Sequence, residues 1–182
     1  MNIIRLMFYI TLLCFNGCSI HSSQYNFIKS QIKKEDNQFK PNWKVYWIGQ
    51  EKDVYAINDD DYIYFANFDG FILSFDGWQT REVVGLFAND LKMVINKEGA
   101  ELKYFTNNTF VANNRCEEWS EELLLNKIKM WKQICYDEII DYNYTNNIAV
   151  NSEGQVIGLR YKLNPNYPAI MLKLNKHKGL EF

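Results

Sequence analysis

The stretch YIYFANFDGFILSFDGWQTREVVGL, Tyr62 to Leu86, carries the most regular pattern in the chain and decides which fold we expect. Apolar residues alternate along two short segments, 62–66 and 71–75, and a period of two is typical of β-strands. The dipeptides Asp69-Gly70 and Asp76-Gly77 follow these segments and supply residues that tolerate the positive φ of tight turns. Two such turns one strand length apart predict an antiparallel meander.

The same rhythm of short apolar segments and turns continues on both sides of this stretch. Almost no segment between the expected strands is long enough for the crossover helix of a parallel sheet. We therefore expect a mainly β fold in which an antiparallel meander forms a sandwich or a barrel. The further strands are expected near 43–47, 54–57, 82–86, 91–96, 101–106, 140–144, 148–150, 156–163 and 169–174.

Two segments depart from the strand pattern and predict short helices. Residues 19–40 are polar but hold Tyr25, Ile28 and Ile32 at helical spacing, which predicts a tether with a short N-terminal helix. The acidic start of 117–126 suits a helix amino terminus, so we expect a second short helix there. A strand should follow it up to Tyr136. One continuous helix through 117–136 is the alternative.

Residues 1–19, MNIIRLMFYITLLCFNGCS, place a short apolar segment behind one arginine. The apolar run, 6–15, is shorter than the roughly 20 residues that a membrane-spanning helix needs. A secretory signal fits better, and Cys18 after Gly17 is similar to the acylated cysteine of a bacterial lipoprotein signal. We expect Cys18 to be acylated, which would anchor the chain in membrane lipid. The alternative is a plain signal peptide cut near Cys18, which leaves a free thiol.

These features divide the chain into three expected parts. Residues 1–17 are the signal peptide, residues 18–40 the lipid anchor and polar tether, and residues 41–182 a single antiparallel β domain. At 182 residues the chain is long enough for one domain with a sizeable core.

The four cysteines divide between the two ends of this layout. Cys14 leaves with the signal and Cys18 is the expected lipid site, so Cys116 and Cys135 remain. In an oxidising compartment these two most simply form a disulfide. A straight helix between them would separate their Cα atoms by about 28 Å, whereas a disulfide allows about 7 Å. The disulfide and the continuous helix are therefore mutually exclusive.

Charge and motifs argue against several function classes. The formal net charge is −2, and nucleic-acid binding needs clustered basic residues, so we expect no nucleic-acid partner. His21 and His177 have no metal-ligand spacing, and no nucleophile elbow, phosphate loop or Cys-x-x-Cys motif is present. We expect no catalytic residue, no metal, no cofactor and no enzymatic activity.

Aromatic residues, 16 % of the chain, are the main candidates for contact with another molecule. We expect most of them in the core, but apolar residues also fall on the opposite strand faces. Large exposed apolar patches are rare on monomers, so one face would be covered by a partner, or exposed rings would stack on sugars. The candidate contact residues are Trp43, Trp47, Trp78, Tyr62 and Tyr64.

Two stretches resemble the YjbF/GfcB-type lipoproteins of capsule and exopolysaccharide operons. YFANFDGFILSFDGWQTREVVGL, Tyr64 to Leu86, is similar to that family's strand, Gly-centred turn and closing Thr-x-x-x-Gly-Leu-like segment. NSEGQVIGLRYKLNPNYPAIMLKLNK, Asn151 to Lys176, is similar to its C-terminal Gly turn, strand, proline interruption and last strand. Ser19 after Cys18 is similar to lipoproteins that are sent to the outer membrane.

The resemblance implies a mainly β lipoprotein on the periplasmic face of the bacterial outer membrane. Such a protein would work beside an outer-membrane β-barrel partner in polysaccharide export, without catalysing a reaction. The first alternative is a periplasmic carbohydrate-binding module that uses exposed aromatic residues. The second is an enzyme whose site the sequence does not reveal.

Overall fold

The computed structural model describes residues 41–59, 61–86, 91–123, 128–176, 180 and 182. Lys40–Phe182 forms one compact unit, and the described residues all belong to it. The expected signal, Cys18 and the short N-terminal helix lie outside the described residues. Among the residues that are described, no helix has the length and hydropathy to cross a membrane.

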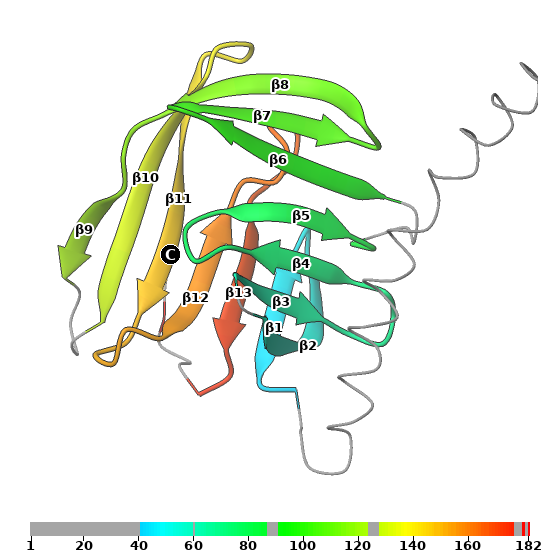
Figure 1. Cartoon of the computed structure of the whole chain (residues 1–182), viewed down its shortest axis with the longest axis vertical. Helices are drawn as coiled ribbons and strands as arrows, with labels where there is room; N and C mark the ends of the chain where they lie inside the picture. The colour runs from blue at the N-terminus through cyan, green and yellow to red at the C-terminus, as the bar shows by residue number, and fades with distance from the viewer. Residues whose placement is uncertain (1–40, 60, 87–90, 124–127, 177–179, 181) are drawn as a thin grey trace, which may run out of the picture. The chain divides into compact units, whose positions relative to one another are not determined.

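The described residues form thirteen strands, and each strand pairs antiparallel with its neighbours (Figure 1). Short turns join most of them, and the Asp-Gly dipeptides that predict tight turns lie between neighbouring strands. The strands are β1 (Trp43–Trp47), β2 (Gln50–Asp59), β3 (Tyr62–Ala66), β4 (Ile72–Phe75), β5 (Thr80–Val84), β6 (Lys92–Glu98), β7 (Glu101–Thr106), β8 (Thr109–Cys116), β9 (Ser120–Leu123), β10 (Lys129–Asp137), β11 (Tyr142–Val150), β12 (Val156–Tyr161) and β13 (Ile170–Leu174).

Twelve of these strands close into a barrel. Strands β1 to β8 pair in chain order, β8 pairs with β10, and β10 to β13 continue the ring until β13 returns to β1. Strand β9 pairs with the first half of β10, on the edge that β8 uses at the second half. Closure removes the free edges that an open sheet would expose.

The expectation of a mainly β fold with a short helix near 117–126 is wrong in its helical part. The fold is an all-β closed barrel, and the described residues contain no helix. Ser120–Leu123 is strand β9, where Glu121 lies 2.9 Å from Lys129 of β10 and Glu122 pairs with Lys132. Cross-strand ion pairs and the hydrogen bonds to β10 therefore prevail over the helical spacing of this segment. The continuous helix is also excluded, because 129–137 is strand β10.

The expected disulfide between Cys116 and Cys135 is confirmed. The two residues are direct register partners on β8 and β10, and their Cα atoms lie 4.0 Å apart. Both side chains are buried in the interior of the barrel. The disulfide therefore cross-links β8 to β10. These strands are neighbours in the ring although β9 lies between them in the sequence.

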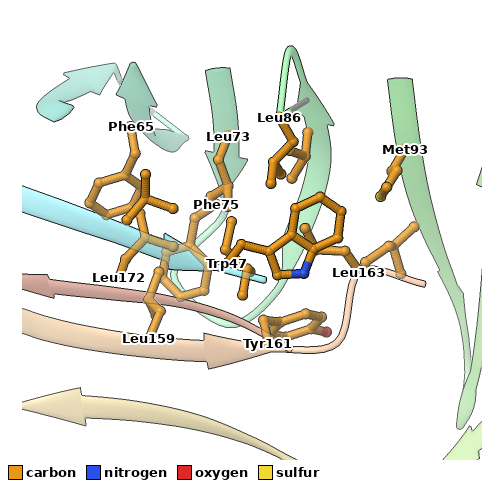
Figure 2. Packing of buried hydrophobic residues seen from close by; sticks show 14 of the residues in the cluster. Trp47, Phe65, Leu73, Phe75, Leu86, Met93, Leu159, Tyr161, Leu163 and Leu172 are labelled. Carbon is orange, nitrogen blue, oxygen red and sulfur yellow. The ribbon is translucent and has the colours of Figure 1, made fainter. Parts of the chain in front are cut away.

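The core fills the inside of the barrel, because every second residue of each strand faces its axis. Strand β1 shows this alternation, with Trp43, Val45 and Trp47 buried and the residues between them half-buried. Figure 2 shows part of the cluster that these side chains join. Its labelled members are Trp47, Phe65, Leu73, Phe75, Leu86, Met93, Leu159, Tyr161, Leu163 and Leu172.

A second, smaller apolar cluster contains Met130, Ala149, Ile157 and Leu180, with Phe182 packed against it. Met130 and Ala149 are register partners on β10 and β11, on the strand faces opposite the barrel core. Gly158 makes the approach of Leu180 and Phe182 feasible, because a Cβ there would lie 2.4 Å from Leu180 and 2.6 Å from Phe182.

Within the fold-deciding stretch, the backbone of Gly85 lies very close to that of Gly70. Gly85 has a φ of +72°, and a Cβ on it would lie 2.3 Å from the carbonyl oxygen of Gly70. Only glycine fits this position without strain, since a side chain would need both an unfavourable φ and a shift of the neighbouring backbone. The end of β5 can therefore pack directly against the turn between β3 and β4.

Candidate functional site

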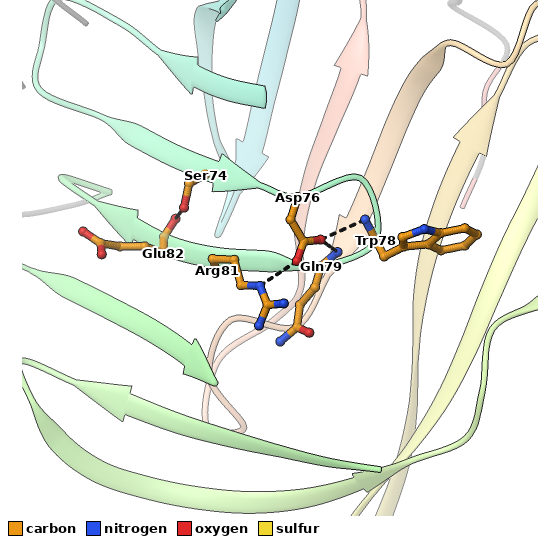
Figure 3. A network of polar contacts seen from close by, with 6 residues as sticks. All are labelled: Ser74, Asp76, Trp78, Gln79, Arg81 and Glu82. Atoms are coloured by element: carbon orange, nitrogen blue, oxygen red, sulfur yellow. Dashed lines mark hydrogen bonds and ion pairs between the residues drawn. The ribbon is translucent and has the colours of Figure 1, made fainter. Parts of the chain in front are cut away.

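The turn between β4 and β5 presents Trp78 on a rigid support (Figure 3). One carboxylate oxygen of Asp76 accepts hydrogen bonds from the backbone N–H groups of Trp78 at 3.0 Å and Gln79 at 2.6 Å. Its other oxygen accepts a bond from Nε of Arg81 at 2.6 Å. Gly77 has a φ of +92°, which closes the turn. Trp78 is 47 % exposed at the tip of this turn.

Trp78 belongs to a cluster of three tryptophans that the fold brings together from distant parts of the chain. Its ring centroid lies 5.1 Å from that of Trp131 on β10, at an interplanar angle of 84°. The centroid of Trp119, just before β9, lies 6.0 Å from it at 49°. Such edge-to-face and tilted contacts are favourable for aromatic rings. We call Trp78, Trp119 and Trp131 the tryptophan cluster.

The strands beneath this cluster also carry an ion pair. Trp131 faces Glu121 across the β9–β10 pair, and Lys129 lies two residues before Trp131, on the same face. Nζ of Lys129 lies 2.9 Å from Oε1 of Glu121, and both side chains keep a third or more of their surface exposed. This is the inner face of the sheet, because Cys135 shares it and is buried in the barrel core.

The same β4–β5 turn forms one wall of an open groove. The groove has a volume of about 490 Å³ and takes its other wall from the ends of β2 and β3. Its lining is polar and acidic where it is exposed, and apolar at Phe75 and Ile63. The lining residues are Asn58, Asp59, Asp61, Tyr62, Ile63, Phe75, Asp76 and Gly77.

A separate polar network lies inside the barrel. The hydroxyls of Tyr104 and Tyr144 are 2.6 Å apart, and the side-chain amide of Asn114 donates to the Tyr144 hydroxyl at 3.0 Å. Burial raises the pKa of Tyr104 well above its ordinary value and also raises that of Tyr144. These phenols stay neutral and lie in the closed interior, where they satisfy one another's hydrogen bonds. We therefore assign this network to the stability of the barrel.

Trp43 and Trp47, two of the expected contact residues, are core residues. They are 5 % and 3 % exposed, and the indole N–H of Trp47 donates to the carbonyl of Pro168 at 2.8 Å. Tyr62 and Tyr64 lie on the outer face of β3 with ring centroids 5.9 Å apart, and Tyr62 is 37 % exposed. Trp78 is thus the expected contact residue that the fold places in a cluster with further aromatic residues.

Sequence reasoning missed Trp119 and Trp131 as members of this site. The usable signal was the alternation of Trp119 with Glu121 and of Lys129 with Trp131, which is the strand period. That signal was hidden because Trp131 also fits a helical stripe. As for metals, the described residues hold no group of three or more His, Cys, Asp or Glu side chains arranged to bind an ion.

The fold and the cluster together define a closed, disulfide-linked antiparallel β-barrel with an aromatic inner face beside its β4–β5 turn. No family model and no curated protein matches the sequence. Among solved structures, the chain is similar to the hypothetical lipoprotein YmcC from Escherichia coli (K12), with a TM-score of 0.54 and 14 % sequence identity. The match covers 91 % of this chain and 100 % of that one, and it shows a shared fold.

Proposed function

We propose that this chain is a lipid-anchored protein of the bacterial envelope that assists the export or assembly of surface or capsular polysaccharide and catalyses no reaction. The main support is that the sequence and the fold both suggest a lipoprotein. The sequence places an acylation-type cysteine, Cys18, after a short signal, and the barrel shares its fold with a protein described as a lipoprotein. Acylation at Cys18 would hold the barrel at a membrane through the polar tether 18–40.

The site of action in this proposal is the periplasmic face of the outer membrane. The support is the resemblance of 64–86 and 151–176 to the YjbF/GfcB-type lipoproteins, together with Ser19 after the expected lipid site. In this setting the barrel acts through contact with an outer-membrane β-barrel partner of the export system.

The β10–β11 hairpin offers the surface for that contact. Its exposed side chains include Ile139 at 70 %, Tyr142 at 55 % and Ile140 at 51 %, and Ile134 and Tyr136 are also exposed on β10. The hairpin is held in shape because the hydroxyl of Tyr136 donates to Asp141 at 2.8 Å. Apolar side chains gathered on one hairpin are typical of a binding surface, since water solvates them poorly.

The test of the anchor is the intact mass of the mature protein from a bacterial host. We expect cleavage before Cys18, a diacylglyceryl-sized mass increase on that residue, and loss of membrane association in a Cys18→Ala variant. The same variant should lower the amount of cell-surface polysaccharide, measured by uronic acid or hexose content of washed cells. An unmodified Cys18 in the mature protein contradicts the proposal.

The test of the partner uses mild extraction and chemical cross-linking in whole cells. Wild type should cross-link to an outer-membrane β-barrel protein, and Ile139→Ser with Ile140→Ser should abolish the cross-link. Phe68→Ser is the matched control, because Phe68 is 44 % exposed on the turn between β3 and β4. An equal loss in both variants, or no envelope partner in wild type, argues against this surface.

A further inference from the structure

We propose that the tryptophan cluster is a binding site for a neutral oligosaccharide segment, with Trp78 as the ring on which a pyranose stacks. This inference deepens the proposed function, since it names the class of polymer segment that the barrel would hold. It rests on the arrangement of the cluster, its neighbouring charges and the groove at the same turn.

The first argument is that Trp78 is exposed at a cost. An indole with 47 % of its surface in water forgoes hydrophobic stabilisation that a polar residue at a turn tip would not forgo. Its contacts with Trp119 and Trp131 bury only part of the ring, whereas Trp43 and Trp47 of the same chain are almost fully buried. A large ring kept in water on a well-fixed turn is typical of a contact residue.

The second argument is that the ring is held in place before any ligand arrives. Asp76 accepts bonds from two backbone N–H groups of the turn, Arg81 holds Asp76, and Trp131 packs against Trp78 nearly at a right angle. Little conformational entropy is then lost when a ligand packs on the exposed surface of the ring. A pyranose presents a flat face of C–H groups that fits such a rigid aromatic surface.

The third argument is the choice of polar groups around the cluster. Glu121 accepts hydrogen bonds and Lys129 donates them, and both lie on the face that carries Trp131. The groove at the same turn adds Asn58, Asp59 and Asp61. A planar carboxylate opposite an indole, as Glu121 is opposite Trp131, suits the alternating hydroxyls and C–H faces of a sugar.

The charged residues of the site favour a neutral saccharide over an acidic one. The described residues that line the groove include three aspartates and neither Lys nor Arg. Lys129 on the cluster face is already paired with Glu121 at 2.9 Å, and Arg81 at the turn is paired with Asp76 at 2.6 Å. An acidic sugar would place a carboxylate near these aspartates, and like charges in a partly desolvated site repel. A neutral hexose or N-acetylhexosamine chain avoids this repulsion.

The shape of the site favours a saccharide over a folded protein. The face that carries Trp131, Glu121 and Lys129 is the inner face of a curved sheet, so it is concave. A narrow polymer chain can lie along a concave inner face, whereas protein interfaces of stable complexes bury about 800 Å² on each partner. The exposed hairpin surface at Ile139 and Ile140 is better suited to a protein.

The test is a titration of the full-length protein in a detergent without a sugar headgroup. The probes are cellohexaose and chitohexaose as neutral chains, and a hexamer of galacturonic acid as the acidic chain. We expect at least one neutral hexamer to shift tryptophan emission saturably, with the dissociation constant confirmed by calorimetry. Trp78→Ala should weaken that binding about tenfold or more.

Matched variants separate binding from folding. Trp78→Phe keeps a ring and should retain intermediate affinity, and Glu121→Gln should bind more weakly than wild type. Phe110→Ala is the control, because Phe110 is 55 % exposed on β8 and lies outside the cluster. Each variant is first shown to unfold with the same midpoint as wild type, so that a change in affinity reports the site.

Three results would overturn the inference: no saturable binding of either neutral hexamer, tighter binding of the galacturonate hexamer than of both neutral ones, or unchanged affinity in Trp78→Ala. None of these depends on Cys18 or on the cross-linked partner. A protein that carries lipid and finds its partner but binds no sugar refutes only the saccharide site. Sugar binding by a protein without lipid refutes only the anchor.

Discussion

The hydroxyl oxygens of Tyr104 and Tyr144 lie 2.6 Å apart in the closed interior of the barrel, joining β7 to β11 across the ring. Tyr144 also accepts a bond from Asn114 of β8, so its hydroxyl serves two neighbours. We predict that Tyr144→Phe lowers the free energy of unfolding by about 1–3 kcal/mol, because it leaves buried polar groups without a partner.

Tyr104→Phe is the matched comparison for that variant. It removes the same chemical group but leaves Tyr144 bonded to Asn114, so we expect a smaller loss. Urea unfolding followed by tryptophan emission measures both. A loss in Tyr104→Phe that equals or exceeds the loss in Tyr144→Phe would mean that the hydroxyl of Tyr144 is not the centre of the network.

Stability should fall at alkaline pH because three interior tyrosines resist ionisation. Burial raises the pKa of Tyr104 and Tyr161 well above 10 and raises that of Tyr144 as well. In the unfolded chain the phenols ionise near pH 10, so above that pH the folded state holds more protons than the unfolded one. The stabilisation is complete below pH 10 and decreases as the pH rises toward the pKa of each phenol in the folded state, by at most about 1.4 kcal/mol per unit for each tyrosine.

Unfolding curves at pH 8 and pH 11 measure this loss. Tyr161→Phe should make the decrease shallower, since it removes one of the three groups. Phenolate absorbance provides the second reading. If all tyrosines ionise near pH 10 while the barrel is still folded, the interior phenols are not shielded as the fold implies.

Reduction of Cys116–Cys135 should destabilise the barrel without opening it completely. The bond spans a sequence separation of 19, for which loop closure in the unfolded chain corresponds to about 3 kcal/mol. The measurement is thermal unfolding with and without reductant. The double variant with alanine at both positions should unfold at the midpoint of the reduced wild type. An oxidised wild type that unfolds no later than the reduced protein would contradict the prediction.

Gly158→Ala should displace Leu180 and Phe182 from β12. The added Cβ would lie within 2.6 Å of both side chains, and overpacking of this kind costs about 1–3 kcal/mol. A chain that stops at Lys176 provides the control, because the same substitution should cost little there. Equal losses in the long and short chains would show that the contact with Leu180 and Phe182 is not the cause.

Gly85→Ala should be more damaging than Gly99→Ala, although both glycines have positive φ. Gly99, with a φ of +61°, has open space where a Cβ would go, whereas Gly85 has the Gly70 carbonyl 2.3 Å away. The difference between the two variants therefore isolates the steric contact from the backbone strain. We expect Gly85→Ala to cost about 1 kcal/mol or more beyond Gly99→Ala, by urea unfolding. Equal losses of unfolding free energy in the two variants would show that the close approach of Gly85 to Gly70 is not the cause.

The sequence predicts those parts of the fold that local chemistry dictates. Asp69-Gly70 and Asp76-Gly77 mark real corners, and the glycine of each pair has a positive φ. The disulfide followed from the number of cysteines and the expected compartment. These features depend on residues close together in the chain or on simple counting.

Features that depend on distant partners could not be predicted in the same way. Glu121 and Glu122 fit a helix start, and it is the pairing with β10, through backbone hydrogen bonds and two lysines, that makes the segment a strand. The tryptophan cluster likewise joins a turn tip to residues far along the chain, and no period in the sequence records that contact. Trp43 is buried and Trp78 is exposed, and the sequence could not separate them because the burial of a side chain also depends on distant partners.

The pairing of β1 with β13 sets the time at which this protein can finish folding. Trp43 and Leu174 are register partners, although they stand at opposite ends of the described strands in the sequence. During synthesis the amino-terminal strands emerge first, so β1 waits with an open edge until β13 has been made. Open edges invite pairing with other chains, and contacts between distant residues form slowly. We therefore expect ring closure to come late in folding, and the newly made chain to be most open to wrong pairing before then.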